Sequence, residues 1–358
     1  MRRNGFLLVM MLTLAACSGR PGPELLAPMP AHRVEGARSV TVHVVTTRAD
    51  APDMPFAFGR GRAGAPQYAE FDISIPPGHQ PGQIEWPEQT ADPAKSFVTV
   101  GQRRMGGQEL ARGVAGEHVG LYVHGYNTSF QEALYRLAQL SADAHLAGTP
   151  VLFSWPSEAH VAAYMADRDG ADYSRSALAN LLQQLTAGAK PGDTVSVLAH
   201  SMGARLMMEA LRELNMTGRG AVIDRLDIIL AALDIDVDLF HEQLAALRPM
   251  KRPITVLVSS DDRALKVSSR LAAGRPRLGL ADVHDPEIQQ GAQQAGITIV
   301  DITALPKGDS AHSRYVGLIS AGGLAAEGNP FRLVRQAGAF VFNQVGATFG
   351  GIGSVLED

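Results

Sequence analysis

Short apolar runs rich in β-branched residues alternate with longer amphipathic stretches along most of the chain. The short runs predict strands at residues 40–45, 71–75, 119–123, 151–153, 195–198, 226–230, 254–258 and 297–302. The amphipathic stretches predict helices near residues 130–146, 174–185, 202–214, 238–247 and 263–272. Strands that alternate with helices form a mostly parallel sheet covered on both faces, so we predict an α/β fold. The first two strands have no helical pattern between them, which indicates an antiparallel start to this sheet.

Two segments depart from this alternation. Residues 50–66 are rich in glycine and proline and are predicted to form a loop. Residues 331–345 have a helical pattern and are followed by a glycine-rich end.

The composition is that of an ordinary globular protein, with 46% hydrophobic and 19% charged residues. The 358 residues include 32 basic and 36 acidic ones, which gives a net charge of −4. Nucleic-acid-binding domains carry a basic surplus that is absent here, so we expect no nucleic-acid partner.

The N-terminus has the pattern of an export signal. Arg2 and Arg3 precede an almost unbroken apolar run over residues 6–16. A helix that spans a membrane needs about 20 apolar residues, so this shorter run predicts a signal peptide at residues 1–16. The run ends in Leu-Ala-Ala-Cys, which resembles a bacterial lipoprotein cleavage box, and its Cys17 is the only cysteine of the chain. We therefore expect Cys17 to be lipidated.

The residues that follow suit a tether. Residues 17–38 contain four prolines and little periodic structure, so they are predicted to link the lipid to a domain at residues 39–358. The lipid would make the membrane a partner and hold the protein in the cell envelope. Ser18 after the cysteine is typical of attachment to the outer membrane, facing the periplasm. The sequence leaves the oligomeric state open.

The motif Ala199-His200-Ser201-Met202-Gly203 follows one predicted strand directly and precedes a predicted helix. A serine on a sharp strand-to-helix turn projects its hydroxyl from the end of the sheet, and small residues two positions before and after it allow that turn. Gly203 meets this requirement, while Ala199 stands where glycine is more usual. We predict that Ser201 is a nucleophile; the alternative is a serine that only caps the helix.

The segment His124-Gly125-Tyr126-Asn127 ends the predicted strand at 119–123. In hydrolases with such a nucleophile, one backbone N–H after this strand and one after the serine bind the oxyanion of the transition state. We therefore predict the N–H groups of Tyr126 and Met202 as the oxyanion hole. His124 is expected to support the loop rather than to transfer protons.

The same architecture orders its catalytic residues as nucleophile, acid and base. Asp261 and Asp262 follow the strand at 254–258, and His312 follows the strand at 297–302. The acid holds the imidazole in the correct tautomer, and the histidine takes the proton from the serine. Asp234, one strand earlier, is an alternative acid. His284 precedes the last strand, which makes it the weaker candidate for the base.

Other motifs do not support a metal or a cofactor. Residues 59–64 have glycines at the spacing of a dinucleotide-binding loop, but no predicted strand precedes them and no helix follows. Residues 234–238 begin like a calcium-binding loop, yet Leu239 stands where glycine is required. The eleven histidines lack zinc-protease spacing. We therefore expect neither a metal nor a cofactor.

Several of these segments together resemble a group of bacterial α/β-hydrolases in the esterase/lipase superfamily, long described as a domain of unknown function. The resembling segments are residues 124–130, 153–157, 200–203, 234–236, 260–265 and 312–313. The resemblance implies the α/β-hydrolase fold over about residues 40–319. It also favours Asp262 over Asp261, because the matching aspartate is followed by Arg-Ala-Leu. It does not define a substrate.

The sequence thus predicts a serine hydrolase that cleaves carboxylic esters through an acyl-enzyme, with Ser201, His312 and Asp262 as its triad. The expected substrates are small-molecule or lipid esters. A thioesterase, acyltransferase or peptidase that uses the same triad is one alternative. A catalytically silent, membrane-anchored binding protein is another.

Overall fold

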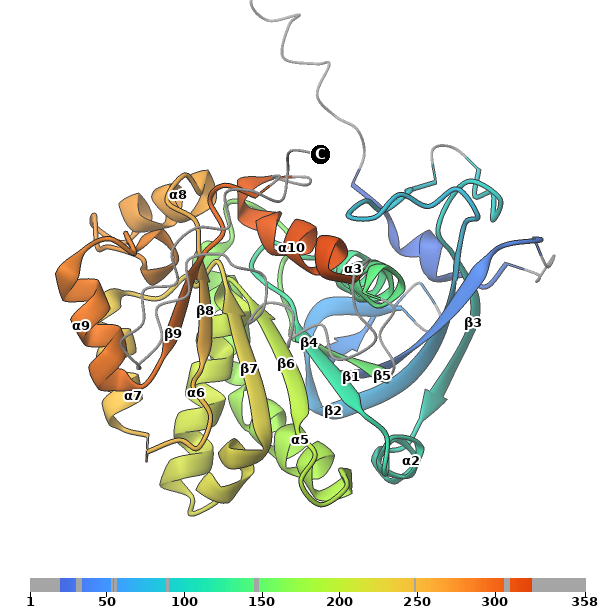
Figure 1. The fold of residues 1–358 in the computed structure, drawn as a ribbon. Coiled ribbons are helices and arrows are strands. Elements are labelled where there is room, and N and C mark those ends of the chain that lie inside the picture. Colours follow the sequence, from blue (N-terminus) through green and yellow to red (C-terminus); the bar gives the residue numbers. More distant parts are fainter. Residues whose placement is uncertain are drawn as a thin grey trace, which may run out of the picture.

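The centre of the computed structural model is a nine-stranded sheet with the order β3-β2-β1-β5-β4-β6-β7-β8-β9 (Figure 1). The structure describes residues 20–29, 34–52, 54, 57–87, 90–144, 148–247, 249–305 and 310–323. The strands are β1 (Arg38–Asp50), β2 (Phe58–Ile75), β3 (Val98–Met105), β4 (Val119–Val123), β5 (Thr149–Ser154), β6 (Val195–His200), β7 (Leu226–Ala231), β8 (Thr255–Val258) and β9 (Thr298–Asp301). The pairs β1–β2 and β2–β3 are antiparallel, and every pair from β1–β5 to β8–β9 is parallel. The α/β class and the antiparallel start predicted from the sequence are confirmed.

Helices connect the parallel strands and cover both faces of the sheet (Figure 1). The α-helices are α2 (Gly107–Gly113), α3 (Phe130–Asp143), α4 (Tyr164–Tyr173), α5 (Arg175–Gly188), α6 (Met202–Met216), α7 (Val237–Ala245), α8 (Arg263–Leu271), α9 (Pro286–Ala295) and α10 (Arg314–Gly323). The short 3-10 helices are η1 (Pro23–Leu26), η2 (Gly220–Arg225), η3 (Leu278–Leu280) and η4 (Ala311–Ser313).

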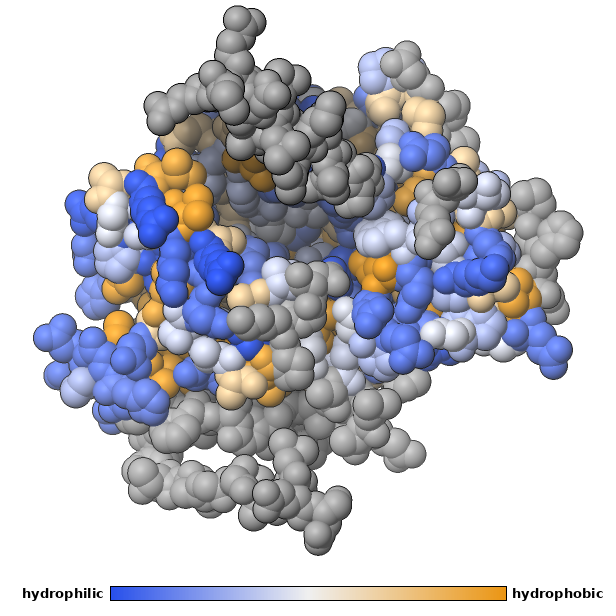
Figure 2. Space-filling model, turned by 90° about the horizontal axis from the view of Figure 1, so that it is seen from above, coloured by the Kyte–Doolittle hydropathy of each residue, from blue (hydrophilic) through white to orange (hydrophobic). Residues whose placement is uncertain are grey.

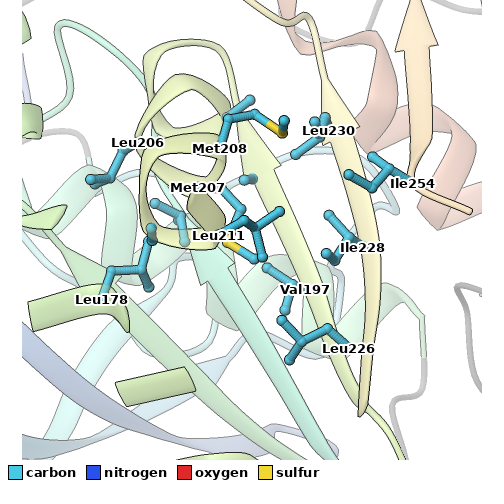
Figure 3. Packing of buried hydrophobic residues seen from close by; sticks show 14 of the residues in the cluster. Leu178, Val197, Leu206, Met207, Met208, Leu211, Leu226, Ile228, Leu230 and Ile254 are labelled. Atoms are coloured by element: carbon cyan, nitrogen blue, oxygen red, sulfur yellow. The ribbon is translucent and has the colours of Figure 1, made fainter. Parts of the chain in front are cut away.

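Alternate residues of the central strands enter two separate cores. In β6, Val195, Val197 and Ala199 face the core under α5 and α6, whereas Leu198 faces the core under α3 and α10. This is the period-2 pattern of a strand buried on both faces. Figure 3 shows that Met207, Met208 and Leu211 of α6 pack against the side chains of β6 and β7. Each such side chain stabilises the fold by roughly 1.5–3 kcal/mol when buried, which fixes α6, and with it Ser201, on the sheet.

The loop predicted for residues 50–66 is wrong over most of its length. β2 begins at Phe58 and pairs with β1, with register shifts near Arg48. The pairing with β3 begins only at Tyr68, so the earlier part of β2 is an edge of the sheet. Pro66, which has no N–H to donate, is tolerated at such an edge. This part is largely exposed, so it lacks the apolar alternation that predicts a strand.

Several elements have no counterpart among the predicted ones: β3, α2, α4, α9 and α10. β3 lies at the edge of the sheet, and only its first two residues, Val98 and Thr99, are buried. α2, α4 and α9 bury only one to three residues each, so their apolar periodicity is weak. The helical pattern predicted at 331–345 lies outside the described residues, as do the signal peptide and Cys17.

Part of the segment expected to be a tether lies against the domain. In η1, Leu26 is buried, and the carbonyl of Leu25 accepts hydrogen bonds from Tyr135 of α3 at 2.9 Å and Thr99 of β3 at 2.9 Å. Residues 20–29 therefore form a strap across the antiparallel end of the sheet. No helix in the described ranges is long and apolar enough to cross a membrane.

Candidate active site

Ser201 stands on a strained turn between β6 and α6. Its backbone φ is 53° and ψ is −120°, a left-handed conformation that is uncommon for a residue with a side chain. Strain of this kind costs on the order of 1–3 kcal/mol and is kept where the surrounding structure enforces it. Here the packed β6 and α6 enforce it, because both flank Ser201 directly. This is the strand-to-helix geometry that the sequence motif predicts for a nucleophile.

Two glycines let neighbouring segments approach this turn closely. A Cβ on Gly203 would lie 2.3 Å from the carbonyl oxygen of His124 and 2.7 Å from that of Val123, so α6 can begin against the end of β4 only with glycine there. A Cβ on Gly125 would lie 3.0 Å from the Cβ of Ser201. The loop after β4 and the Ser201 turn are therefore in direct contact.

Some backbone N–H groups of this loop and of the Ser201 turn donate hydrogen bonds within the protein, and others do not. The N–H of Asn127 donates to Asp167 at 2.9 Å, and that of Thr128 donates to Ser157 at 3.2 Å. Those of Tyr126 and Met202 have no acceptor within the part of the chain that the structure describes. The two groups predicted to form the oxyanion hole are thus available for a ligand.

His124 is a structural part of this loop. Its ring is fully buried and stacks on Trp155, with 4.8 Å between ring centroids, so Trp155 serves as packing for the loop. Burial, with the cationic Arg48 nearby, lowers the pKa of His124 to about 3, so the ring is neutral. Its Nδ1–H donates to the Gly125 carbonyl at 2.9 Å, and its Nε2 accepts from the Trp155 N–H at 3.2 Å.

Arg48 holds the other side of the loop. The side chain is buried, and burial lowers its pKa to about 9. Its guanidinium donates to the Ser154 hydroxyl at 2.9 Å and to the Thr128 carbonyl at 2.9 Å. The Ser154 hydroxyl lies 3.2 Å from Nε2 of His124. One charged group thus fixes both the β5 end and the loop after β4.

The depressed pKa of His124 predicts a loss of stability in acid. The unfolded histidine takes up a proton near pH 6.5, whereas the folded one remains neutral down to about pH 3. Its contribution to stability is therefore complete above pH 6.5 and is lost as the pH falls below that value. Thermal denaturation between pH 4 and 8 should show a smaller acid-side fall in Tm for His124→Asn than for wild type. The exposed His241 is the control: His241→Asn should keep the wild-type slope. Equal slopes for wild type and His124→Asn would contradict the assignment.

The structure brings Asp262 and His312 together. Nδ1 of His312 donates to Oδ2 of Asp262 at 2.8 Å. The other carboxylate oxygen of Asp262 caps α8 by accepting from the N–H groups of Ala264 and Leu265. The Asp262 side chain is fully buried, and both of its oxygens are used, so its orientation is fixed.

Asp234, the alternative acid, belongs to a separate network. It pairs with Arg277 at 3.2 Å and accepts hydrogen bonds from Tyr164 and Ser268. It has no hydrogen bond to His312 among the described side chains. His284, the weaker candidate for the base, is exposed and comes just before α9.

Asp261 lies in the turn before α8, as its position after the strand suggests, whereas the cap of that helix is Asp262. Both carboxylate oxygens of Asp261 accept from the guanidinium of Arg314, at 2.7 and 2.8 Å. Arg314 is buried and also donates to the Leu305 carbonyl. Arg314 follows His312 by two residues, so this pair anchors the segment that carries the histidine. Sequence reasoning missed it, because the two residues lie far apart along the chain.

His200 was also missed as a site residue. Its ring centroid lies 4.6 Å from that of His312, and its Nε2–H donates to the His312 carbonyl at 3.1 Å. Burial, with His312 close by, holds the pKa of His200 well below its ordinary value, so the ring is neutral. The residue before Ser201 thus holds the backbone of His312 without adding a positive charge. Its place in the serine motif was the available signal.

The Ser201 hydroxyl itself has no hydrogen bond among the described residues, including none to Nε2 of His312. Its side chain is 2% exposed and lies in the turn that holds His312 through His200. Catalytic hydrogen bonds are often long in the absence of substrate and shorten in the reacting complex.

A cavity of about 390 Å³ is lined by residues that include Arg38, His43 and Thr149. It opens at the amino end of the parallel strands, whereas Ser201 follows the carboxyl end of β6. In the described ranges, no group of three or more His, Cys, Asp or Glu side chains could hold a metal ion.

Comparison with known proteins gives one family. The sequence matches the family described as "Alpha/beta hydrolase of unknown function" (DUF900) over residues 108–319, more than half of the chain. No curated protein matches the chain. Among solved structures, the chain is similar to one described as "putative cell surface hydrolase" from Lactobacillus plantarum WCFS1, with 11% identity and a TM-score of 0.36. That match covers 63% of this chain and 98% of the other.

Proposed function

Since the chain belongs to this α/β-hydrolase family, we propose that it is a serine hydrolase that cleaves carboxylic esters through an acyl-enzyme on Ser201. The observation that carries the proposal is the hydrogen bond between the buried Asp262 and the partly exposed His312, whose ring lies against the residue that precedes a serine on a strained turn. A serine that only caps a helix needs no such pair. The Ser201 side chain also accepts no cap hydrogen bond.

The reaction follows from the tautomer of His312. Because Nδ1 donates to Asp262, Nε2 carries a lone pair and accepts the proton of the Ser201 hydroxyl. The serine oxygen attacks the ester carbonyl, and the resulting oxyanion binds the N–H groups of Tyr126 and Met202. The C–O bond to the alcohol then breaks, and His312 returns the proton to the leaving oxygen. Water attacks the acyl-enzyme in the same way and releases the acid.

We propose in addition that the protein is a lipoprotein of the cell envelope. The support is the sequence alone: the basic and apolar start followed by Leu-Ala-Ala-Cys, with Cys17 as the lipidated residue. The anchor would face the periplasm at the outer membrane. The ester substrate would then be a small molecule of that compartment or a lipid.

Pre-steady-state kinetics with p-nitrophenyl esters test this function. An ester that acylates Ser201 faster than water removes the acyl group gives a burst of p-nitrophenol equal to the enzyme concentration. Parallel panels of thioesters and anilides, at matched acyl length, measure the preference among the three bond types. The proposal predicts a burst with esters and higher kcat/KM for them. Faster turnover of thioesters or amides would overturn the ester assignment, and turnover without a burst under rapid mixing would count against the acyl-enzyme.

A further inference from the structure

The helix that follows Asp262 has an exposed surface with unpaired positive charge. In α8, the exposed residues Arg263, Lys266, Val267, Arg270 and Leu271 recur at spacings of three and four. This spacing puts them on one face of the helix, while Leu265 and Ser268 are buried on the other. The helix has no acidic residue.

No described residue compensates the positive charges of this face. None of the side chains of Arg263, Lys266 and Arg270 has an ion pair or hydrogen bond to any residue that the structure describes. Three other arginines of this region are each paired with an aspartate: Arg275 with Asp238, Arg277 with Asp234 and Arg314 with Asp261. The contrast marks the α8 face as a cationic surface with no partner among the described residues.

Large apolar side chains are exposed beside these charges. Val267 is 52% and Leu271 64% exposed on α8 itself. Val161, which precedes α4, is 72% exposed, and Met165, in the first turn of α4, is 56% exposed. Tyr164 joins the two regions, because its hydroxyl lies 3.3 Å from that of Ser268 in α8.

These residues lie at the carboxyl end of the sheet, where Ser201 stands. Figure 1 places α8 at the upper end of the molecule, and Figure 2, seen from that end, shows blue and orange residues close together around a hollow. The ring of Tyr126, a predicted oxyanion-hole residue, lies edge-on to that of Tyr164, 5.4 Å between centroids. The α8 surface is therefore continuous with the rim of the active site.

We propose that this surface, the α8 rim (Arg263, Lys266, Val267, Arg270 and Leu271, with Val161 and Met165), docks on an anionic phospholipid bilayer. A helix with basic and apolar residues on its exposed side binds at the headgroup level, through apolar burial and attraction to anionic lipids. Each basic residue near such a surface contributes about 1 kcal/mol. Unpaired cations and exposed aliphatic side chains on one face fit both requirements.

The start of the described chain lies at the end of the molecule that would face the bilayer. Arg20 forms an ion pair with Glu132 at 2.6 Å and donates to the Asn127 side chain at 2.8 Å, next to Tyr126. Arg20, the first described residue, therefore lies at the active-site end of the sheet, and Cys17 precedes it by three residues in the sequence.

Docking would determine what reaches the active site. Asp262 caps α8, so a bilayer against α8 lies close to the Asp262–His312 pair. The substrate class would then be an ester of a membrane phospholipid. This last step rests on the proposed hydrolase function, whereas docking itself does not require catalysis.

Tryptophan quenching by brominated phospholipids tests the docking. The full chain is bound to vesicles that contain phosphatidylglycerol with brominated acyl chains, and the emission of Val267→Trp is compared with that of wild type, which has Trp86 and Trp155. The matched control is Met216→Trp. Met216 is 69% exposed and ends α6, whose 15 residues lead about 22 Å away from Ser201. We expect the brominated vesicles to quench the emission of the tryptophan added in Val267→Trp and to leave that of the tryptophan added in Met216→Trp unchanged.

Charge removal completes the test. Lys266→Gln and Arg270→Gln, each in the Val267→Trp background, should lower the docking equilibrium about fivefold, which is about 1 kcal/mol for each charge. Quenching of neither added tryptophan, or of both equally, would overturn the proposal. Equal quenching in phosphatidylcholine vesicles would overturn the anionic preference. The same experiment on Ser201→Ala should give the wild-type result, so a failed hydrolase proposal and a failed docking proposal are told apart.

Discussion

Ser201→Ala and His312→Ala should each lower kcat for ester hydrolysis by about a million-fold, and the double variant should lose no more than either one. The reason is that the two side chains act as one unit. Without the imidazole the hydroxyl keeps its proton, and without the hydroxyl the imidazole has no nucleophile to activate. Residual turnover from the oxyanion hole and binding alone should be the same in all three variants.

Steady-state kinetics on the ester with the largest burst measure this loss, and thermal denaturation checks that each variant is folded. The control is His241→Ala, because His241 is exposed on the outer helix α7 and is distant from Ser201 in the sequence. It should retain wild-type kcat. A folded Ser201→Ala variant with near wild-type turnover would show that another residue is the nucleophile.

Asp262→Asn should lower kcat about ten-thousand-fold with little change in fold. The amide can still offer its oxygen to the N–H groups of Ala264 and Leu265, so the cap of α8 is kept. In that orientation its NH2 group faces Nδ1 of His312, which must then carry the lone pair. The proton moves to Nε2, where it blocks acceptance of the serine proton.

Asp234→Asn is the matched control, because the sequence left Asp234 open as the acid. It disturbs the contacts with Arg277 and Tyr164, not the His312 ring, so its loss of kcat should be far smaller. The two variants are compared in kcat and in melting temperature. A ten-thousand-fold loss in Asp234→Asn, with Asp262→Asn nearly unaffected, would reverse the assignment of the acid.

The central sheet was predictable from the sequence, because its strands are buried on both faces. All eight predicted runs are strands, and the predicted run at 119–123 has the same bounds as β4. The exposed edge was not predictable in this way. The first part of β2 and most of β3 have no alternation of apolar and polar residues, because little of either is buried.

Some features of the candidate site could likewise be predicted from the sequence, and others could not. The positions of Ser201, Tyr126 and Met202 just beyond the ends of strands could be predicted, because the sequence marks where these buried strands end. For the pair of Asp262 and His312, the order of the elements and the resemblance to a family could only reduce the number of candidate acids and bases. The supporting contacts of Arg314 with Asp261 and of His200 with His312 join residues more than 50 positions apart, and a single sequence carries no signal for them.

Labelling with a fluorophosphonate, followed by mass spectrometry of the peptides, tests the central claim most directly. The probe reacts with a serine whose proton is taken by a neighbouring base, and the adduct identifies that serine. The account predicts one adduct, on Ser201, which is absent from Ser201→Ala and strongly reduced in His312→Ala. A folded wild-type protein that remains unlabelled, or that carries the adduct on a different residue, would contradict it.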